Sequence, residues 1–88
     1  MQYAWDPAKN RANLAKRGID FADVVAVFED EFALARPDAD SRGESRFVIV
    51  GMDGFGRHLV VVFTERDARI RIISARPATT KERKSYEG

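Results

Sequence analysis

Residues 56–76 constrain the fold of this 88-residue chain more than any other stretch. Within it, residues 57–65 and 69–76 are rich in β-branched and aromatic side chains, and apolar residues follow the two-residue period of a strand. A short connection separates the two segments, so the simplest prediction is a β-hairpin. In its second strand we expect Ile70, Ile72 and Ser74 on one face and Arg69, Arg71, Ile73 and Ala75 on the other.

Arginine is concentrated in and just after this hairpin. A guanidinium presents a rigid fork of donors that matches phosphate oxygens, and it keeps its charge at any working pH. On a rigid sheet, such a cluster could hold an RNA backbone and stabilise the charge that develops on phosphorus as a 2′-hydroxyl attacks. The alternative is a set of surface salt bridges with Glu65, Asp67, Glu82 and Glu87. The candidate cations are Arg66, Arg69, Arg71 and Arg76, with Lys16 and Arg17 approaching from an earlier helix.

Capping signals predict two helices in the first third of the chain. Asp6 followed by Pro7 predicts the start of a helix that ends just before Gly18. Asp20 predicts the cap of a second helix that runs to about residue 29. The apolar stripe of this second helix, which we expect in the core, consists of Phe21, Val24, Val25 and Phe28.

Further strands and a last helix complete the predicted fold. Residues 32–36 and 46–52 are predicted strands on either side of a polar loop, and Asp53 with Gly54 predicts a turn into the hairpin. Residues 1–5 form either a short strand or a segment anchored by its aromatic side chains. The fold class is therefore α+β, with two N-terminal helices packed on an antiparallel sheet of three to five strands. A capping box of Thr79 and Glu82 predicts a short, basic C-terminal helix.

The whole chain, residues 1–88, is expected to be a single domain because its length suffices for one core. The net charge of +1 hides an uneven distribution. Residues 1–18 hold four Lys or Arg and one acid, residues 19–54 hold three and nine, and residues 55–88 hold eight and four. The two basic ends could therefore meet in one cationic surface on the folded molecule.

Composition excludes several classes of chemistry. The chain has no cysteine and one histidine, so neither a thiolate nucleophile nor a zinc site is expected, and no metal or cofactor is predicted. No apolar run approaches the roughly 20 residues that cross a bilayer, so we expect a cytoplasmic protein with no membrane partner. His58 is the only group with an ordinary pKa near neutrality, but at the start of a strand it is more often structural than catalytic.

An ordered set of short motifs along the chain resembles the BrnT toxin family. The motifs are individually short, and together they cover nearly the whole sequence in the order of the family. They are Trp5-Asp6-Pro7, Lys9, Asn13, Lys16-x-Gly18, Phe21, Phe28-x-Asp30, Gly56-Arg57, Thr64-x-Arg66, Arg71-Ile72-Ile73-Ser74-Ala75-Arg76, Glu82 and Tyr86.

The resemblance implies a RelE-like ribonuclease toxin of a type II toxin–antitoxin system, which blocks translation by cutting RNA without a metal. It also implies a BrnA antitoxin with a ribbon-helix-helix domain, a heterotetramer with that antitoxin, and operator DNA bound only through the complex. In this reading the catalytic residues are Arg66, Arg71, Arg76 and Lys16, and the additional RNA-binding residues are Arg57, Arg69, Lys81 and Arg83.

Two departures from the family pattern leave an alternative open. The family usually has Lys-His-Gly where this chain has Lys16-Arg17-Gly18, and often His-Ser where it has Asp40-Ser41. The alternative function is therefore a catalytically inactive module that only grips an antitoxin or nucleic acid. For an active enzyme, the candidates for the general base are Glu65, Glu44 and Tyr86.

Overall fold

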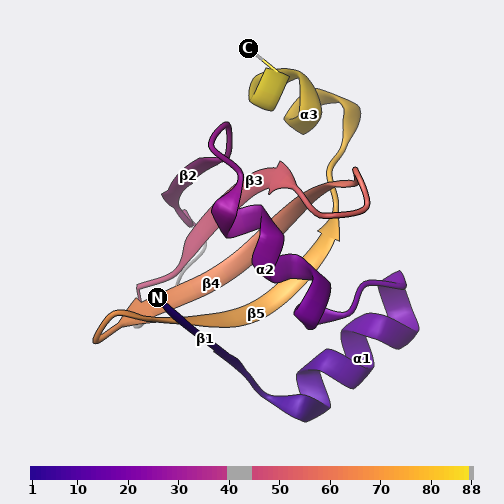
Figure 1. Cartoon of the computed structure of the whole chain (residues 1–88). Helices are drawn as coiled ribbons and strands as arrows, with labels where there is room; N and C mark the ends of the chain where they lie inside the picture. Colours follow the sequence, from indigo (N-terminus) through magenta and orange to yellow (C-terminus); the bar gives the residue numbers. More distant parts are fainter. Residues whose placement is uncertain (40–44, 88) are drawn as a thin grey trace.

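A computed structural model describes residues 1–39 and 45–87 of the chain, and in this part it contains three helices and one five-stranded sheet (Figure 1). The predicted loop between the second and third strands lies partly outside the described residues, as do Asp40, Ser41 and Glu44. The elements are β1 (Gln2–Trp5), α1 (Pro7–Arg17), α2 (Phe21–Glu29), β2 (Leu34–Pro37), β3 (Phe47–Met52), β4 (His58–Arg66), β5 (Arg69–Pro77) and α3 (Thr80–Glu87).

The sheet has the strand order β1-β5-β4-β3-β2. The expected α+β class, the two N-terminal helices and the short last helix are confirmed, and the first five residues do contain a strand. The sheet is mixed and not wholly antiparallel, because β1 pairs in parallel with the first half of β5. This pairing joins residues 2–5 to residues 69–72, which lie far apart in the sequence, so local sequence signals could not predict it.

Local capping explains where the first two helices begin and end. The Asp6 carboxylate accepts a hydrogen bond from the Ala8 N–H at 2.8 Å, and Gly18 ends α1 in the left-handed region with φ 71°. The Asp20 carboxylate accepts from the Ala22 N–H at 3.1 Å at the start of α2. These three predicted helix signals are confirmed.

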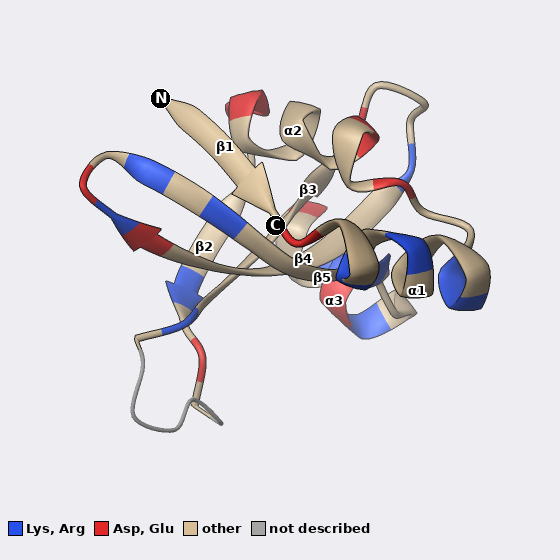
Figure 2. Ribbon diagram, turned by 90° about the horizontal axis from the view of Figure 1, so that it is seen from below, with Lys and Arg blue, Asp and Glu red and all other residues tan. Residues whose placement is uncertain are grey.

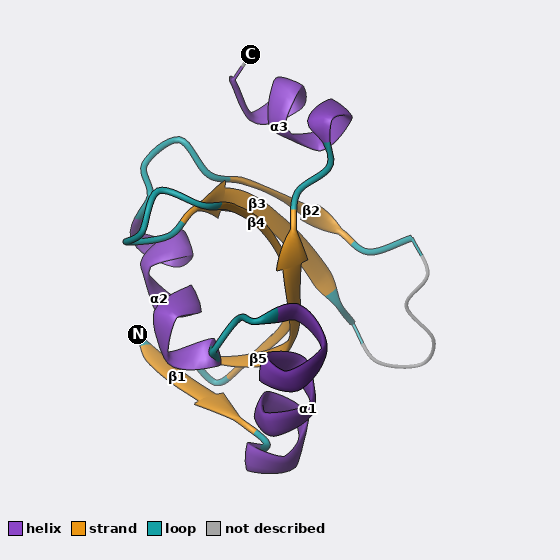
Figure 3. Cartoon of the chain, turned by 90° about the vertical axis from the view of Figure 1, so that its right-hand side faces the viewer, coloured by secondary structure: helices purple, strands orange, loops and turns teal. Residues whose placement is uncertain are grey.

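The core lies between α2 and one face of the sheet, which curves around that helix (Figure 3). Phe21 and Val24 are fully buried, as predicted, and Val27 joins them. Phe28 packs edge-on against Phe63 of β4, with ring centroids 5.0 Å apart. The predicted helical stripe is therefore core, with Val27 as a member that the sequence pattern did not single out.

A β-bulge in β5 overturns one prediction. Val62 pairs with Ser74 and Phe63 pairs with Ile72, so Ile73 is an extra residue with no partner on β4. The alternation restarts beyond it, and Ala75 is fully buried in the core. The prediction that Ala75 shares a face with Arg69 and Arg71, and Ser74 a face with Ile70 and Ile72, was therefore wrong.

The bulge also decides the direction of Arg76. Arg71 pairs with Thr64 and Arg76 with Val60, and these two β4 residues are four apart and so point to the same face. Without the extra residue, Arg76 would point with Ile70 and Ile72 into the core. We call this outward sheet face, which carries Arg66, Arg69, Arg71 and Arg76, the arginine face.

Candidate functional site

Three exposed arginines gather at the tip of the β4–β5 hairpin. A two-residue turn, with Asp67 and Ala68 at φ 53° and 60°, sets Arg66 directly opposite Arg69. Arg71 lies two residues further along the same face of β5. Together with Thr64 and Asp67, the three arginines line a cavity of about 280 Å³. Figure 2 shows basic segments on this hairpin and on α1.

The charges of this group are largely uncompensated. Neither Arg66 nor Arg71 forms an ion pair with another residue of the part that the structure describes, and Arg69 only donates a long hydrogen bond of 3.4 Å to Gln2 Oε1. Like charges set directly opposite each other on neighbouring strands are destabilising. A polyanion bound at the hairpin tip would relieve this repulsion.

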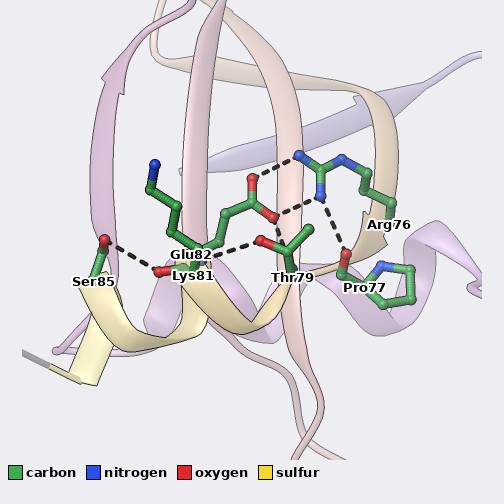
Figure 4. Close-up of polar contacts among 6 residues, drawn as sticks. All are labelled: Arg76, Pro77, Thr79, Lys81, Glu82 and Ser85. Carbon is green, nitrogen blue, oxygen red and sulfur yellow. Dashed lines mark hydrogen bonds and ion pairs between the residues drawn. The ribbon is translucent and has the colours of Figure 1, made fainter.

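Arg76 differs from the other arginines because it already holds an anion. Its Nη1 and Nη2 donate to the two carboxylate oxygens of Glu82 on α3, at 2.8 and 2.7 Å, and Nη1 also donates to the Pro77 carbonyl oxygen at 3.2 Å (Figure 4). The hydrogen bonds from Arg76 lower the pKa of Glu82 to about 2, and the Glu82 carboxylate in turn raises the pKa of Arg76. For this arginine, the salt-bridge alternative is realised.

Lys16 reaches the sheet beside the bulge. The buried Asn13 side chain on α1 accepts from the Ala75 N–H at 3.2 Å and donates to the Ile19 carbonyl oxygen at 3.0 Å. It thereby fixes α1 along the part of β5 that extends beyond its pairing with β1. The residues around the small cavity of about 250 Å³ at this junction include Lys9, Lys16, Arg17, Ile73 and Ser74.

Arg57, one of the predicted RNA-binding cations, is engaged within the β3–β4 turn. Its Nε donates to the Asp53 carboxylate at 2.7 Å, and its guanidinium lies 5.2 Å from the centre of the Phe55 ring. The Asp53 carboxylate also accepts from the Arg57 N–H at 2.8 Å. Arg57 therefore stabilises the predicted turn.

The remaining predicted RNA-binding cations, Lys81 and Arg83, lie on α3, which sits at one end of the sheet (Figures 1 and 3). Arg83 approaches Glu87 at 3.8 Å. It also lines a cavity of about 380 Å³ with Arg17, Arg57 and His58. The predicted cations thus divide into a hairpin group, a group beside α1 and a group at the base of α3.

Of the candidate general bases, the structure describes Glu65 and Tyr86, and neither is a free group beside the hairpin arginines. Glu65 pairs with the buried Ile70 and so points to the opposite side of the sheet. The Tyr86 hydroxyl donates to Asp30 Oδ2 at 2.6 Å, and this bond raises the pKa of Tyr86 to about 12. Glu44 lies outside the described residues. His58 packs against the Tyr86 ring, with centroids 5.2 Å apart.

Sequence reasoning missed Arg36. It is exposed on β2 and pairs with Val48, which pairs with Val62 of β4, so its side chain belongs to the arginine face. Its place in a four-residue edge strand follows only from the pairing of β2 with β3. The alternation within the predicted strand could be read from the sequence. The face of the sheet to which Arg36 belongs could not, because it depends on the pairing of β2 with β3.

Within the described ranges, no three or more His, Cys, Asp or Glu side chains are arranged to hold a metal ion. The helices of the same ranges are all too short or too polar to cross a membrane.

The fold and this face define a small α+β domain with an arginine-lined open sheet surface. Residues 5–82 match the model of a family described as "Ribonuclease toxin, BrnT, of type II toxin-antitoxin system". The chain therefore belongs to the BrnT family of ribonuclease toxins, and the family resemblance seen in its motifs is confirmed.

A solved structure supports this assignment. The 1.1 Angstrom-resolution crystal structure of the Brucella abortus ribonuclease toxin, BrnT, is similar with a TM-score of 0.67 and 25% sequence identity. The match covers 91% of this chain and 99% of that chain. A search of curated proteins found no match. As a member of a type II toxin family, the chain is expected to pair with an antitoxin.

Proposed function

We propose that this protein is an endoribonuclease toxin that cleaves RNA without a metal ion and thereby inhibits translation in the cytoplasm. Arg66 and Arg71 bind the phosphates that flank the scissile bond, Arg76 stabilises the charge on the scissile phosphate, and Lys16 assists from α1. The remaining RNA contacts come from Arg57, Arg69, Lys81 and Arg83.

One observation carries this proposal: the uncompensated arginines on the rigid β4–β5 hairpin. Arg66, Arg69 and Arg71 share one face and one cavity, and strand pairing fixes the backbone positions from which their side chains extend. The three positive charges are therefore already close together where the negative charge of a transition state would develop. They also bind an RNA backbone regardless of its sequence.

The protein's partner is proposed to be a BrnA-like antitoxin with a ribbon-helix-helix domain. The toxin and antitoxin would form a heterotetramer, and operator DNA would be bound only through that complex. This proposal rests on the family, whose members are toxins of type II systems.

A second candidate function, an inactive module that binds RNA or antitoxin only, is favoured by a specific observation. Of the described candidates for the general base, Glu65 points to the opposite sheet face, and the Tyr86 hydroxyl donates its hydrogen bond to Asp30. Positioning and charge stabilisation would then have to supply the rate without a dedicated base.

The test is cleavage of purified cellular RNA by the antitoxin-free protein with a chelator present. We expect cleavage by the wild type, a loss of at least about tenfold in Arg71→Ala, and no loss in Arg11→Ala, an exposed α1 arginine outside the site. RNA binding by the wild type without any cleavage would favour the inactive module. Cleavage that disappears with the chelator and returns with Mg²⁺ would contradict a metal-independent reaction.

A further inference from the structure

The last helix provides the anion that fills the arginine fork of β5. Glu82 serves two purposes at once, because its Oε1 also accepts from the Thr79 N–H at 2.8 Å while the Thr79 hydroxyl accepts from the Glu82 N–H at 3.2 Å. The capping box therefore holds the Glu82 carboxylate at the start of α3, within reach of Arg76. Figure 4 shows the carboxylate facing the guanidinium fork.

The attachment of α3 to the rest of the molecule consists mainly of polar contacts, with one ring contact between Tyr86 and His58. None of its residues, all of which are described, is fully buried. Its side-chain hydrogen bonds to the body of the protein are the pair with Arg76 and the bond from Tyr86 to Asp30. A cavity of about 290 Å³ is lined by Ser85 and Tyr86 of α3 and by Leu34 and Val50 of the sheet. A helix held in this way can leave the sheet at little cost in buried apolar area.

A carboxylate and a phosphodiester offer a guanidinium fork the same pair of anionic oxygens. We propose that the Arg76–Glu82 pair is a phosphate subsite for RNA that the free protein keeps filled with its own carboxylate. RNA contacts the Arg76 guanidinium only when its phosphate displaces the Glu82 carboxylate and α3 moves away from the arginine face. The choice of RNA as the ligand rests on the proposed function. The inference adds that the Glu82 carboxylate competes with the RNA phosphate for Arg76.

The physical consequence is a lowered affinity for RNA in the resting protein. A ligand that binds only one conformation of a protein has its affinity reduced in proportion to the fraction of molecules in that conformation. Removing the Glu82 carboxylate should therefore tighten RNA binding. Removing Glu87 from the same helix should tighten it less, because that change leaves the Arg76–Glu82 pair in place and affects only net charge and the long 3.8 Å pair with the exposed Arg83. The chain offers both changes in matched form.

The experiment compares Glu82→Gln with Glu87→Gln. Both variants remove one negative charge from α3, and glutamine preserves the capping box at position 82. The probe is a single-stranded RNA oligonucleotide with 2′-O-methyl riboses, which cannot be cut, and its affinity is measured by fluorescence anisotropy over a range of NaCl concentrations. We expect Glu82→Gln to bind about 3- to 10-fold more tightly than Glu87→Gln, with a salt slope steeper by about 0.7 for one added phosphate contact.

Two further variants make the result specific to Arg76. Adding Arg76→Ala to Glu82→Gln should abolish the gain. Tyr86→Phe, which loosens α3 without touching either member of the pair, should give a smaller gain in the same direction. Equal affinities of Glu82→Gln and Glu87→Gln, or a gain that survives Arg76→Ala, would overturn the inference.

A second readout separates this inference from the ribonuclease proposal. The Nε–Hε NMR signal of Arg76 is followed in Glu82→Gln and Glu87→Gln as inorganic phosphate is added, and a saturable shift is expected only in Glu82→Gln. That shift in a protein that cleaves no RNA would support the subsite and contradict the enzyme. Arg71-dependent RNA cleavage without the shift would support the enzyme and overturn the subsite.

Discussion

The Tyr86 hydroxyl on α3 donates a 2.6 Å hydrogen bond to the carboxylate of Asp30 at the end of α2. The same Asp30 oxygen accepts from the Met52 N–H at 2.8 Å, and the other carboxylate oxygen accepts from the Phe32 N–H at 3.0 Å. Burial alone would raise the pKa of Asp30, but these hydrogen bonds together lower it. One carboxylate thus ties α2, β3 and α3 together.

Tyr86→Phe should release α3 while leaving the core folded. A hydrogen bond to a charged acceptor contributes about 1.5–3 kcal/mol, but Asp30 keeps its two backbone donors, so the loss in global stability should be near the lower end. Amide exchange in α3 should accelerate about tenfold, and amides of β4 should not change. Ser85→Ala on the adjacent exposed position is the control, and equal exchange in both variants would contradict this role of Tyr86.

The stability of the protein should fall in acid partly through Glu82. Its pKa drops from 4.5 to about 2 on folding, so its contribution is fully present above about pH 4.5 and is lost as the pH falls toward 2. Urea unfolding at pH 7, 4 and 3 should show a smaller loss in Glu82→Gln than in the wild type. Parallel pH profiles for the two proteins would show that the ion pair with Arg76 does not contribute.

Asn13→Ala should destabilise the junction of α1 and β5. The change leaves the Ala75 N–H and the Ile19 carbonyl without their side-chain partner in a region where Asn13 is 8% exposed. We expect a cost of about 2–3 kcal/mol in the free energy of unfolding, measured with urea, and faster exchange at the Ala75 amide. Arg11→Ala on the exposed side of α1 should cost less than about 0.5 kcal/mol. Similar costs for the two variants would contradict the clamp.

Two glycines offer a matched test of packing behind the sheet. A Cβ on Gly51 would lie 2.9 Å from Val27 Cγ1 and 3.1 Å from Ala33 Cβ, whereas a Cβ on Gly54 would meet nothing within 4 Å. Because Val27 is fully buried and cannot move away, Gly51→Ala should cost about 1–3 kcal/mol. Gly54→Ala should be nearly neutral in the same thermal or urea measurement, and equal effects would refute the close approach of α2 to β3.

Local signals in the sequence determined most of the secondary structure. The caps at Asp6, Asp20 and Thr79, the helix end at Gly18 and the hairpin turn near Asp67 all involve groups within a few residues of one another. Their hydrogen bonds depend on local backbone geometry and so can be read from short patterns. The class of fold and the presence of an arginine cluster on the hairpin followed from the same patterns.

The tertiary structure alone decided how the cluster is divided. A single extra residue, Ile73, turns Arg76 onto the arginine face, and only the pairing of β5 with β4 reveals it. The sequence named Glu82 both as a cap and as a possible salt-bridge partner, but the docking of α3 selected Arg76 for it and left Arg66 and Arg71 unpaired among the described residues. Contacts such as these depend on how separate elements meet, and local propensity carries no information on that.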